Sequence, residues 1–523
     1  MPAELVSGLL STTRLGRAHT VALHGLRAHA VTVEANIGRG LPGMQVVGLG
    51  DTSVRESRER IRTAVANSGL EWPRTKVVVS LSPASLPKSG GHFDLAITLA
   101  VLSAMLGGQQ AQRARQRLDS TLVVGEVALD GSLRAISGAL PALLSAQRGG
   151  LRSAVIPPGN AAEAALVSGL DIRVAVTLSE AMEWVLGECS LPGPVGLGSD
   201  SSDSRSIGDF AEVAGQPQAI RAAEVAAAGG HHFMLIGPPG SGKSMIAQRL
   251  AGILPALSAE QIVEATAVHS LVAPSFCGPI YRAPFIAPHH SITRAGLLGG
   301  GSGIPQPGAV SLAHHGVLFL DEASEIPATV LDSLRTPLDH AQVRMVRAQR
   351  EYLFPARFQL VMAANPCRCA ASEPQLCRCA PRQRATYLDN LSGPLRDRLD
   401  IVVRTHAVGS NLGADGSSPS SADLAARVKQ ARERAARRWR EAGRTERCNA
   451  EIPSPLLRRR FPATPEAMAL LEGYLAQGSL SQRAVDRTLK IAWTLSDLSG
   501  GTRPGLKEIT EAIDLHGSVQ GET

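Results

Sequence analysis

The sequence predicts a multidomain α/β protein, and three observations support this. The chain has 523 residues, whereas one domain holds roughly 100–200. Two stretches rich in Gly, Ser, Pro and Asp interrupt it, and the block between them alternates apolar runs with helical segments, as in a parallel sheet covered by helices. We therefore expect domains at residues 1–189, 207–408 and 422–523, joined by linkers at 190–206 and 409–421.

The first block is expected to be an α+β domain. Val77–Pro83 and Thr121–Leu129 are rich in β-branched residues and predict strands. Phe93–Leu106 is apolar over enough residues to predict a buried helix.

The middle block opens with a glycine-rich turn. In MLIGPPGSGKSMIAQRL a Gly-x-x-x-x-Gly-Lys-Ser pattern follows an apolar strand and precedes an amphipathic helix, which is the context a P-loop requires. Glycines let backbone N–H groups surround phosphates, and the helix N-terminus favours negative charge. The pattern predicts ATP binding, with Lys243 at the β- and γ-phosphates and Ser244 on Mg²⁺. The expected nucleotide contacts are Gly237, Pro238, Pro239, Gly240, Ser241, Gly242, Lys243 and Ser244.

Polar residues end the next two apolar runs of this block. GVLFLDE ends in Asp321 and Glu322, and FQLVMAAN ends in Asn365. The carboxyl ends of parallel strands meet at one edge of a sheet, where α/β proteins bind ligands. We expect Asp321 to hold the Mg²⁺ shell, Glu322 to polarise the attacking water and Asn365 to orient that water.

The last block is predicted to be helical and begins with a basic segment. Residues 421–460 contain 12 Lys/Arg against 5 Asp/Glu, and the whole chain has a net charge of +7. A basic helix either contacts DNA phosphates or forms a solvated face, and the sequence leaves both open.

The chain resembles the AAA+ ATPases in the order of its motifs: a P-loop, then the Asp-Glu pair, then the strand-end Asn, then a helical block with arginines. More narrowly, the chain resembles the ComM/YifB family of the magnesium-chelatase-like subgroup over nearly its whole length. The resemblance implies an AAA+ core, a helical lid domain, and a homo-oligomeric ring, usually a hexamer, with nucleotide between subunits. The matching stretches are Asp209–Gln216, Ala287–Gly301, Pro307–Glu322, Phe354–Cys369, Leu391–Ile401 and Leu480–Leu498.

The same resemblance implies roles for several arginines. Arg398 matches the residue that a neighbouring subunit supplies to the transferring phosphoryl group, with Arg396 as a nearby alternative. Arg483 matches a lid arginine that contacts the γ-phosphate in cis, and Arg487 lies one helical turn later. The strip that flanks the adenine matches Val213 and Gly215.

Val343–Phe354 is predicted to form a β-hairpin before the strand that ends in Asn365. In ring helicases of this superfamily such hairpins contact the nucleic-acid backbone, and Arg344, Arg347 and Arg350 recur here at three-residue spacing. Alternatively, these arginines form a solvated basic edge that discourages sheet aggregation.

The resemblance implies ATP-driven branch migration or helicase action on single-stranded or branched DNA during homologous recombination. A magnesium-chelatase motor subunit is the alternative.

Four of the seven cysteines lie within thirteen residues. Cys367, Cys369, Cys377 and Cys379 form C-x-C-x7-C-x-C, and four thiolates suit a tetrahedral structural Zn²⁺. The alternative is a loop of reduced thiols. Cys189, Cys277 and Cys448 stand alone and have no predicted role.

Val31–Val65 and Ser80–Leu102 resemble the ribosomal-S5-domain-2-like fold, which Lon protease domains share. The Ser-Lys dyad of Lon is missing, because His92 and Leu140 occupy the corresponding positions. Ser89 beside Lys88 is read as part of a basic loop. We therefore expect a non-proteolytic module, and a Lon-like protease is the least favoured alternative.

The sequence shows no apolar run of about 18 residues and no signal-peptide pattern, which predicts a cytoplasmic protein without a membrane partner.

Overall fold

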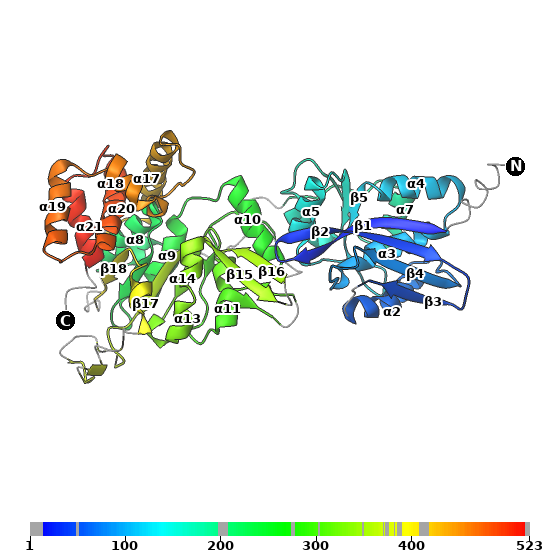
Figure 1. Cartoon of the computed structure of the whole chain (residues 1–523), viewed down its shortest axis with the longest axis horizontal. Helices are drawn as coiled ribbons and strands as arrows, with labels where there is room; N and C mark the ends of the chain where they lie inside the picture. The colour runs from blue at the N-terminus through cyan, green and yellow to red at the C-terminus, as the bar shows by residue number, and fades with distance from the viewer. Residues whose placement is uncertain are drawn as a thin grey trace.

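The computed structural model describes residues 14–48, 52–196, 208–272, 278–301, 304–347, 350–369, 371, 376–380, 382–383, 387, 390–406 and 418–517. The molecule is elongated, with the N-terminal sheet at one end, the C-terminal helices at the other, and a second sheet between them (Figure 1). Residues 197–207 and 407–417, which make up most of the two predicted linkers, lie outside the described part of the chain.

A seven-stranded mixed sheet organises the N-terminal part, in the order β3-β4-β2-β1-β5-β8-β9. Strands β1 and β2 form an antiparallel hairpin. On the other side of β1, strands β5, β8 and β9 follow, and each pairs in parallel with the strand before it in this order. The strands are β1 Leu15–His24, β2 Arg27–Ile37, β3 Gly43–Val47, β4 Lys76–Ser82, β5 Thr121–Val123, β8 Ser153–Ile156 and β9 Asp171–Val174. The helices are α2 Thr52–Asn67, α3 Asp94–Met105, α4 Gly108–Leu118, α5 Ala139–Arg148, α6 Ala161–Ala164 and α7 Leu178–Leu186.

Two predictions for this part hold and one needs correction. The strand at Val77–Pro83 is β4, and the apolar helix is α3, which is buried on all sides between residues 94 and 104. The single strand expected at Thr121–Leu129 is wrong. Gly125 interrupts it, and the chain continues as β6 Glu126–Val127, which pairs with β7 Leu133–Arg134 in a separate ribbon. A Cβ at Gly125 would lie 3.3 Å from both Leu95 and Pro157, so the backbone passes close to other elements there.

The middle part contains a five-stranded sheet in the order β11-β14-β17-β10-β18, and every neighbouring pair is parallel. β14 and β17 are buried throughout, as expected for strands covered on both faces. The predicted mixed α/β architecture with a parallel sheet is therefore confirmed. The strands are β10 Phe233–Ile236, β11 Phe285–Ile286, β14 Val317–Leu320, β17 Gln359–Ala364 and β18 Ile401–Arg404. The helices are α8 Pro217–Gly229, α9 Lys243–Ile253, α10 Ala259–Ser270, α11 Arg294–Leu298, α12 Ala309–Leu312, α13 Ala328–Asp332, α14 Arg335–His340 and α16 Gly393–Arg396.

Two short ribbons extend from this sheet. One pairs β12 Gly299–Gly300 with β13 Gln306–Pro307, and the other is an antiparallel hairpin of β15 Gln342–Arg347 and β16 Arg350–Pro355. The second ribbon matches the hairpin predicted at Val343–Phe354.

Between residues 418 and 517 the C-terminal part contains five α-helices: α17 Ser421–Glu441, α18 Ser454–Arg460, α19 Pro465–Ala476, α20 Gln482–Ser499 and α21 Leu506–Gly517. The Ser420 hydroxyl caps α17 by accepting the Asp423 N–H. One face of α17 is apolar and buried, through Leu424, Val428, Ala431, Ala435 and Trp439, spaced as a helical stripe. This stripe packs α17 against α8 and α20.

The N-terminal and middle parts meet at the hairpin and at the end of α10. Tyr352 and Phe354 of the hairpin are buried with Leu271, and Leu23 and Leu26 pack against them from the N-terminal sheet. The Gly138 N–H donates to the Ser270 carbonyl across the same junction, at 2.7 Å. The hairpin is thus docked on the N-terminal part, as Figure 1 also shows.

Candidate nucleotide site

The P-loop lies between β10 and α9, at the carboxyl edge of the parallel sheet. Gly242 has φ 82°, a left-handed conformation that glycine adopts without strain. Gly237 has no room for a side chain, because a Cβ would lie 2.0 Å from the Thr405 hydroxyl oxygen. These glycines therefore shape the turn that carries the N–H groups around a phosphate.

Lys243 lies at the mouth of this turn. Its ammonium donates to the carbonyls of Gly237 and Pro238 at 2.7 and 2.8 Å and to Asn365 Oδ1 at 3.2 Å. Burial lowers the pKa of Lys243, and the carboxylates of Asp321 and Glu322 partly offset this effect. The bond to Asn365 joins the P-loop to the end of β17.

Ser244 and Asp321 are suited to hold Mg²⁺. The Ser244 hydroxyl donates to Asp321 Oδ2 at 2.6 Å, so two oxygen ligands of the type that Mg²⁺ prefers already meet at one point. Bound there, the ion would neutralise charge on the nucleotide phosphates. The residues present therefore fit the expected metal.

Glu322 follows Asp321 in an uncommon backbone conformation, with φ 49°. Its N–H donates to Asp321 Oδ1 at 2.9 Å, and its carboxylate Oε2 lies 2.9 Å from His290 Nδ1. Sequence reasoning missed this histidine. The adjacent pair His289–His290 in the segment after β11 was the available signal, but nothing local indicated its partner.

The arginines expected at the phosphates lie at the other edge of the sheet. Arg398 donates to both carboxylate oxygens of Asp339, and Arg483 donates to Asp397 at 2.9 Å. Asp397 and Arg398 precede β18, whereas the P-loop follows β10, its parallel neighbour. A four-residue strand spans about 10 Å. The bond to Asp397 places the Arg483 guanidinium at the amino edge of the sheet, and its role in cis stays a prediction.

Arg487, one turn after Arg483, is built into the protein interior. It donates to the Leu399 carbonyl at 3.2 Å and lies 3.4 Å from the buried carboxylate of Asp400. His231 also lies 3.4 Å from that carboxylate. These contacts fasten α20 to the start of β10 and β18.

The segment expected beside the adenine lies near the start of α17. Val213 is buried in the core, and its carbonyl accepts from the Ser418 hydroxyl at 2.9 Å. Gly215 has φ 67°, so this strip turns sharply before α8.

The four clustered cysteines are drawn together. Three Sγ–Sγ distances among Cys367, Cys369 and Cys377 are 3.4, 3.5 and 3.6 Å, and the Cys379 sulfur lies within 4.8 Å of the others. Four thiolates around a tetrahedral Zn²⁺, each about 2.3 Å away, would lie about 3.8 Å apart. N–H groups of Arg378 and Ala371 lower the pKa of Cys369 to about 6, which favours its thiolate. The cluster therefore fits a zinc ion.

A second group of possible ligands has a different character. Glu264 Oε2 lies 2.6 Å from His315 Nε2 and 3.3 Å from His314 Nε2. His314 Nδ1 accepts the Arg357 N–H at 3.1 Å, so its Nε2 carries the hydrogen and donates to the carboxylate. In this structure the group is a hydrogen-bonded link between α10 and the segment before β14.

The hairpin arginines have different partners. Arg344 pairs with Glu351 across the hairpin, and Arg350 donates to the Ser85 carbonyl at 2.6 Å and to His24 Nε2 at 3.4 Å. Arg347 is exposed at the end of β15. Arg350 thus contacts the N-terminal part of the chain, which the sequence did not predict.

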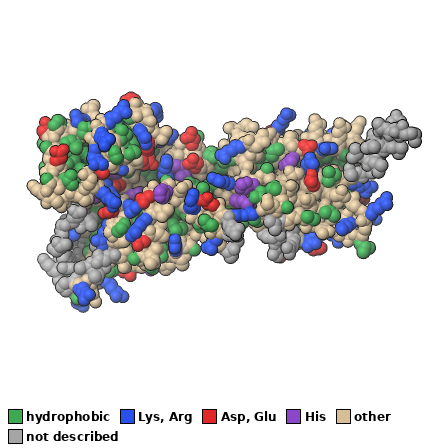
Figure 2. Space-filling view, in the orientation of Figure 1, with side chains coloured by type: hydrophobic (Ala, Val, Ile, Leu, Met, Phe, Trp, Pro, Cys, Tyr) green, Lys and Arg blue, Asp and Glu red, His purple; other side chains and the backbone are tan. Residues whose placement is uncertain are grey.

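The basic helix α17 uses several of its charges internally. Arg427 pairs with Glu224, Arg432 donates to the Ala227 carbonyl, and Arg438 pairs with the buried Asp497. On the face shown in Figure 2, Lys and Arg side chains are spread over all three parts of the molecule. A structural role therefore accounts for much of this helix's charge.

The N-terminal part has no Lon-like dyad at the positions compared. Leu140 is fully buried, and His92 Nε2 lies 2.9 Å from the Val21 carbonyl oxygen. Lys88 is also fully buried, and its ammonium donates to the carbonyls of Leu81 and Pro83. The side chains of His92 and Lys88 thus have backbone partners, and the non-proteolytic role of this part stays a prediction.

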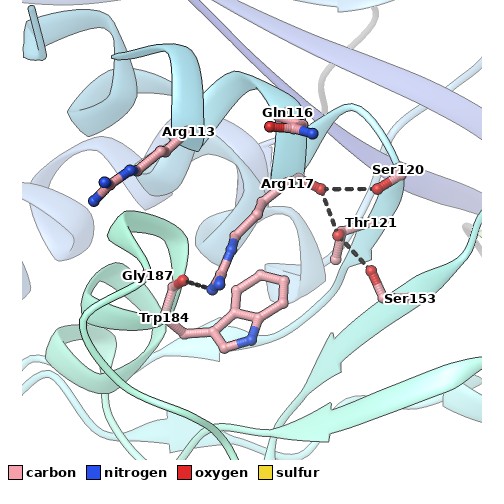
Figure 3. A pocket seen from close by; sticks show the side chains of 8 residues that line it. All are labelled: Arg113, Gln116, Arg117, Ser120, Thr121, Ser153, Trp184 and Gly187. Atoms are coloured by element: carbon pink, nitrogen blue, oxygen red, sulfur yellow. Dashed lines mark hydrogen bonds between the residues drawn. The ribbon is translucent and has the colours of Figure 1, made fainter. Parts of the chain in front are cut away.

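A pocket of about 420 Å³ lies between α4 and α7, away from the nucleotide site (Figure 3). Several of its polar groups bond to one another: Thr121 Oγ1 donates to the Arg117 carbonyl and lies 2.6 Å from Ser153 Oγ. The Arg117 guanidinium lies over the Trp184 ring, 5.1 Å from its centre. We therefore interpret the pocket as a gap in the packing between α4 and α7.

Together, the parallel sheet, the P-loop, the acidic end of β14 and the polar end of β17 define an AAA+-like nucleotide-binding core. Comparisons with known proteins narrow the class. Residues 209–412 match the family described as magnesium chelatase, subunit ChlI. Residues 33–160 match subunit ChlI of Mg-chelatase, and residues 418–516 match the ChlI C-terminal family.

Relatives align over nearly the whole chain. An uncharacterized protein of Mycobacterium tuberculosis (strain ATCC 25618 / H37Rv) is 49% identical over 506 residues, covering 96% of this chain and 98% of the relative. YifB of Escherichia coli is 39% identical over 498 residues, covering 95% and 96%. Competence protein ComM of Haemophilus influenzae is 36% identical over 501 residues, with the same coverage.

The chain belongs to the ComM/YifB family of magnesium-chelatase-like AAA+ ATPases. This membership indicates the use of ATP and Mg²⁺. Within the described ranges, no helix combines the length and apolar character needed to cross a membrane.

Proposed function

We propose that this protein is the subunit of an ATP-hydrolysing ring motor that remodels DNA, as a branch-migration helicase in homologous recombination and natural transformation. The observation that carries the ATPase part is the convergence of Lys243, Ser244, Asp321 and Asn365 at one edge of the sheet. The DNA part rests on the arginine-bearing hairpin and on the relative named as a competence protein.

The chemistry assigned to the site is hydrolysis of the γ-phosphate. Lys243 binds the β- and γ-phosphate oxygens, and Asn365 orients the attacking water. Glu322 takes a proton from that water as its oxygen attacks phosphorus and ADP leaves. Asn365 follows β17, the parallel neighbour of the P-loop strand β10, and Glu322 comes after β14, the parallel neighbour of β17, which supports their joint action.

Neighbouring subunits complete the site in this proposal. Arg398 and Arg483 both bond to aspartates at the amino edge of the sheet, so one surface presents two arginines. In a head-to-tail ring this surface faces the P-loop edge of the next subunit. Both arginines then stabilise charge on the neighbour's transferring phosphoryl group.

DNA is proposed to contact the hairpin of β15 and β16. Arg347 is exposed near its tip, and a guanidinium binds phosphate oxygens without reading sequence. Single-stranded or branched DNA bound in the ring would therefore be held by its backbone.

The test measures ATP hydrolysis with and without branched DNA, together with branch migration by the purified protein. Lys243→Ala should abolish hydrolysis and branch migration, whereas Lys507→Ala, an exposed lysine on α21, should leave both unchanged. Branch migration that persists in Lys243→Ala would exclude the mechanism.

A magnesium-chelatase motor subunit is the second candidate, because the three matching families carry that description. The full-length alignments with YifB and ComM favour the first. ATP hydrolysis stimulated by porphyrin-binding partner proteins, and not by DNA, would reverse this preference.

We also propose that Cys367, Cys369, Cys377 and Cys379 hold a structural Zn²⁺. The close approach of the four sulfurs supports this assignment. Metal analysis of purified protein tests it: one zinc per chain is expected, and a zinc-free wild-type protein would exclude it.

A further inference from the structure

Thr494 lies on the same face of α20 as Arg483 and Arg487. Counted from Arg483, the positions four and eleven residues later in an α-helix are rotated by only about 40° and 20° around its axis. Arg483 donates to Asp397 at 2.9 Å, and Arg487 donates to the Leu399 carbonyl at 3.2 Å. This face of α20 therefore runs along the segment that leads into β18.

The ring of His231 joins Thr494 to the end of that segment. His231 is fully buried, its Nε2 lies 2.8 Å from the Thr494 hydroxyl oxygen, and its Nδ1 lies 3.4 Å from Asp400 Oδ2. The Thr494 hydroxyl gives its own hydrogen to the Lys490 carbonyl at 3.1 Å, so it accepts a hydrogen bond from His231 Nε2. One imidazole ring thus links α20 to the residue directly before β18.

The helices around this ring leave it little room to move. α8 packs against α20 (Figure 1), and a Cβ added to Gly229 at the end of α8 would overlap both His231 Nε2 and the Thr494 hydroxyl. The Asn449 side-chain amide donates to the same hydroxyl at 3.0 Å. Because a buried polar group that loses its partner is costly, these bonds fix the distance between the His231 ring and α20.

Asp400 receives contacts from three other segments. The His232 N–H donates to Asp400 Oδ2 at 3.2 Å, and Arg487 of α20 lies 3.4 Å from Oδ1. The Asp400 carbonyl oxygen lies 2.9 Å from His516 Nδ1 on α21. Arg398 stands two residues before Asp400 in the chain. The backbone that carries Arg398 and the helix that carries the second arginine are therefore tied together at one carboxylate.

We propose that His231 is a positioning residue for the two arginines that act on the nucleotide of the neighbouring subunit. The inference rests on the proposed function, in which Arg398 and Arg483 both stabilise the neighbour's transferring phosphoryl group. By joining α20 to Asp400, His231 keeps the two guanidinium groups at a set separation on one surface. His231 itself lies before β10, at the edge of the sheet opposite its own P-loop.

Three substitutions test this role, and a fourth is the matched control. His231→Phe keeps the ring and removes both nitrogens, whereas His231→Gln retains an amide N–H close to the position of Nε2. Gly229→Ala adds a methyl group where His231 meets Thr494 and leaves both polar side chains in place. Gly473→Ala on α19 is the control, because no atom of the described residues lies within 4 Å of a Cβ added there.

Hydrolysis of ATP by the full-length protein is measured with branched DNA present, together with ring size and thermal unfolding. A displacement of about 1 Å between catalytic groups can cost about a hundredfold in rate. His231→Phe and Gly229→Ala should therefore lower kcat about tenfold to a hundredfold. Their KM for ATP should stay unchanged, because their own P-loops are intact. His231→Gln should retain most of the activity, and Gly473→Ala should match the wild type.

Mixing each defective variant with Lys243→Ala distinguishes misplaced arginines from a damaged P-loop. His231→Phe subunits supply an intact P-loop, and Lys243→Ala subunits supply correctly placed arginines. About a quarter of the interfaces in a one-to-one mixture join these two, so about a quarter of the wild-type rate should return. A subunit whose own nucleotide site is damaged would gain nothing from such a neighbour.

The inference is overturned if His231→Phe and Gly229→Ala keep the wild-type kcat, or if their mixtures with Lys243→Ala stay as slow as the components. It is also overturned if both variants lose folding or ring assembly, because His231 would then maintain the fold instead of placing the arginines. Failure of the proposed function looks different, since Arg483→Ala and Lys243→Ala would then fail to restore activity to each other as well.

Discussion

Mixing two inactive variants tests whether Arg483 acts on the nucleotide of its own chain or of a neighbour. β10 and β18 pair in register from Phe233 with Ile401 to Ile236 with Arg404. The P-loop follows Ile236, whereas Arg483 is bonded to Asp397, before β18 begins. The strand pair alone separates them by about 10 Å. In the proposed ring, Arg483 is therefore expected to act on the P-loop of another subunit.

The perturbations are Lys243→Ala and Arg483→Ala, each inactive alone. Loss of an arginine that stabilises the transferring phosphoryl group costs about 10³-fold or more in kcat. In a one-to-one mixture, about a quarter of the interfaces join an intact P-loop from one variant to an intact Arg483 from the other. The mixture should therefore recover about a quarter of the wild-type rate of ATP hydrolysis.

If Arg483 acts in cis, every subunit of the mixture lacks one required group and no activity returns. A mixture as inactive as its components, in rings of unchanged size, would refute the reasoning. Arg487→Ala is the matched control on the same helix. Because Arg487 lies against the buried Asp400, this variant should lose thermal stability instead.

Three further outcomes follow from the packing and charges. Cys377→Ser should lower the zinc content of the purified protein to background, whereas Cys189→Ser should not; equal zinc in both would contradict the assigned ligands. Phe354→Ala removes a fully buried side chain at the junction and should cost about 3–5 kcal/mol of stability in thermal unfolding, whereas Val346→Ala, at a 68% exposed position, should change it little. Burial and His314 lower the pKa of His315 to about 4 from 6.5. The folded chain thus takes up this proton less readily than the unfolded chain, so stability of about 3 kcal/mol, present above pH 6.5, is lost as the pH falls to 4. Chemical denaturation of His315→Gln at several pH values should show that its free energy of unfolding falls less between pH 6.5 and 4 than that of the wild type. An equal fall in both proteins would disprove the lowered pKa assigned to His315.

The parts of the fold that local patterns control could be predicted from the sequence. The P-loop glycines, the apolar strands and the polar residues at their ends depend on neighbours in the chain, so the site around Lys243 and Asp321 follows from the motif and its context. The strand expected at Thr121–Leu129 failed because Gly125 must pass close to Leu95 and Pro157, and composition does not reveal such contacts.

The partners of long side chains could not be predicted. Arg483 and Glu322 are bonded to residues that are distant in sequence or lie on other segments, and their geometry depends on how whole elements pack. Likewise, the charges of α17 were ambiguous in sequence, because their use depends on the neighbouring α8 and α20. Arg427 and Arg438 are bonded to Glu224 and Asp497 of those helices.

The contacts of Arg350 bear on how DNA would reach the hairpin in the proposed function. Its guanidinium donates to the Ser85 carbonyl and to His24, and Phe354 is buried at the same junction. A guanidinium held by these partners cannot at the same time bind a phosphate of DNA in full. If DNA binds the hairpin as proposed, contact of Arg350 with DNA would compete with docking of the hairpin on the N-terminal part. Arg347, which is exposed, has no such conflict among the contacts described, so DNA would meet Arg347 first and reach Arg350 only as the hairpin leaves the N-terminal part.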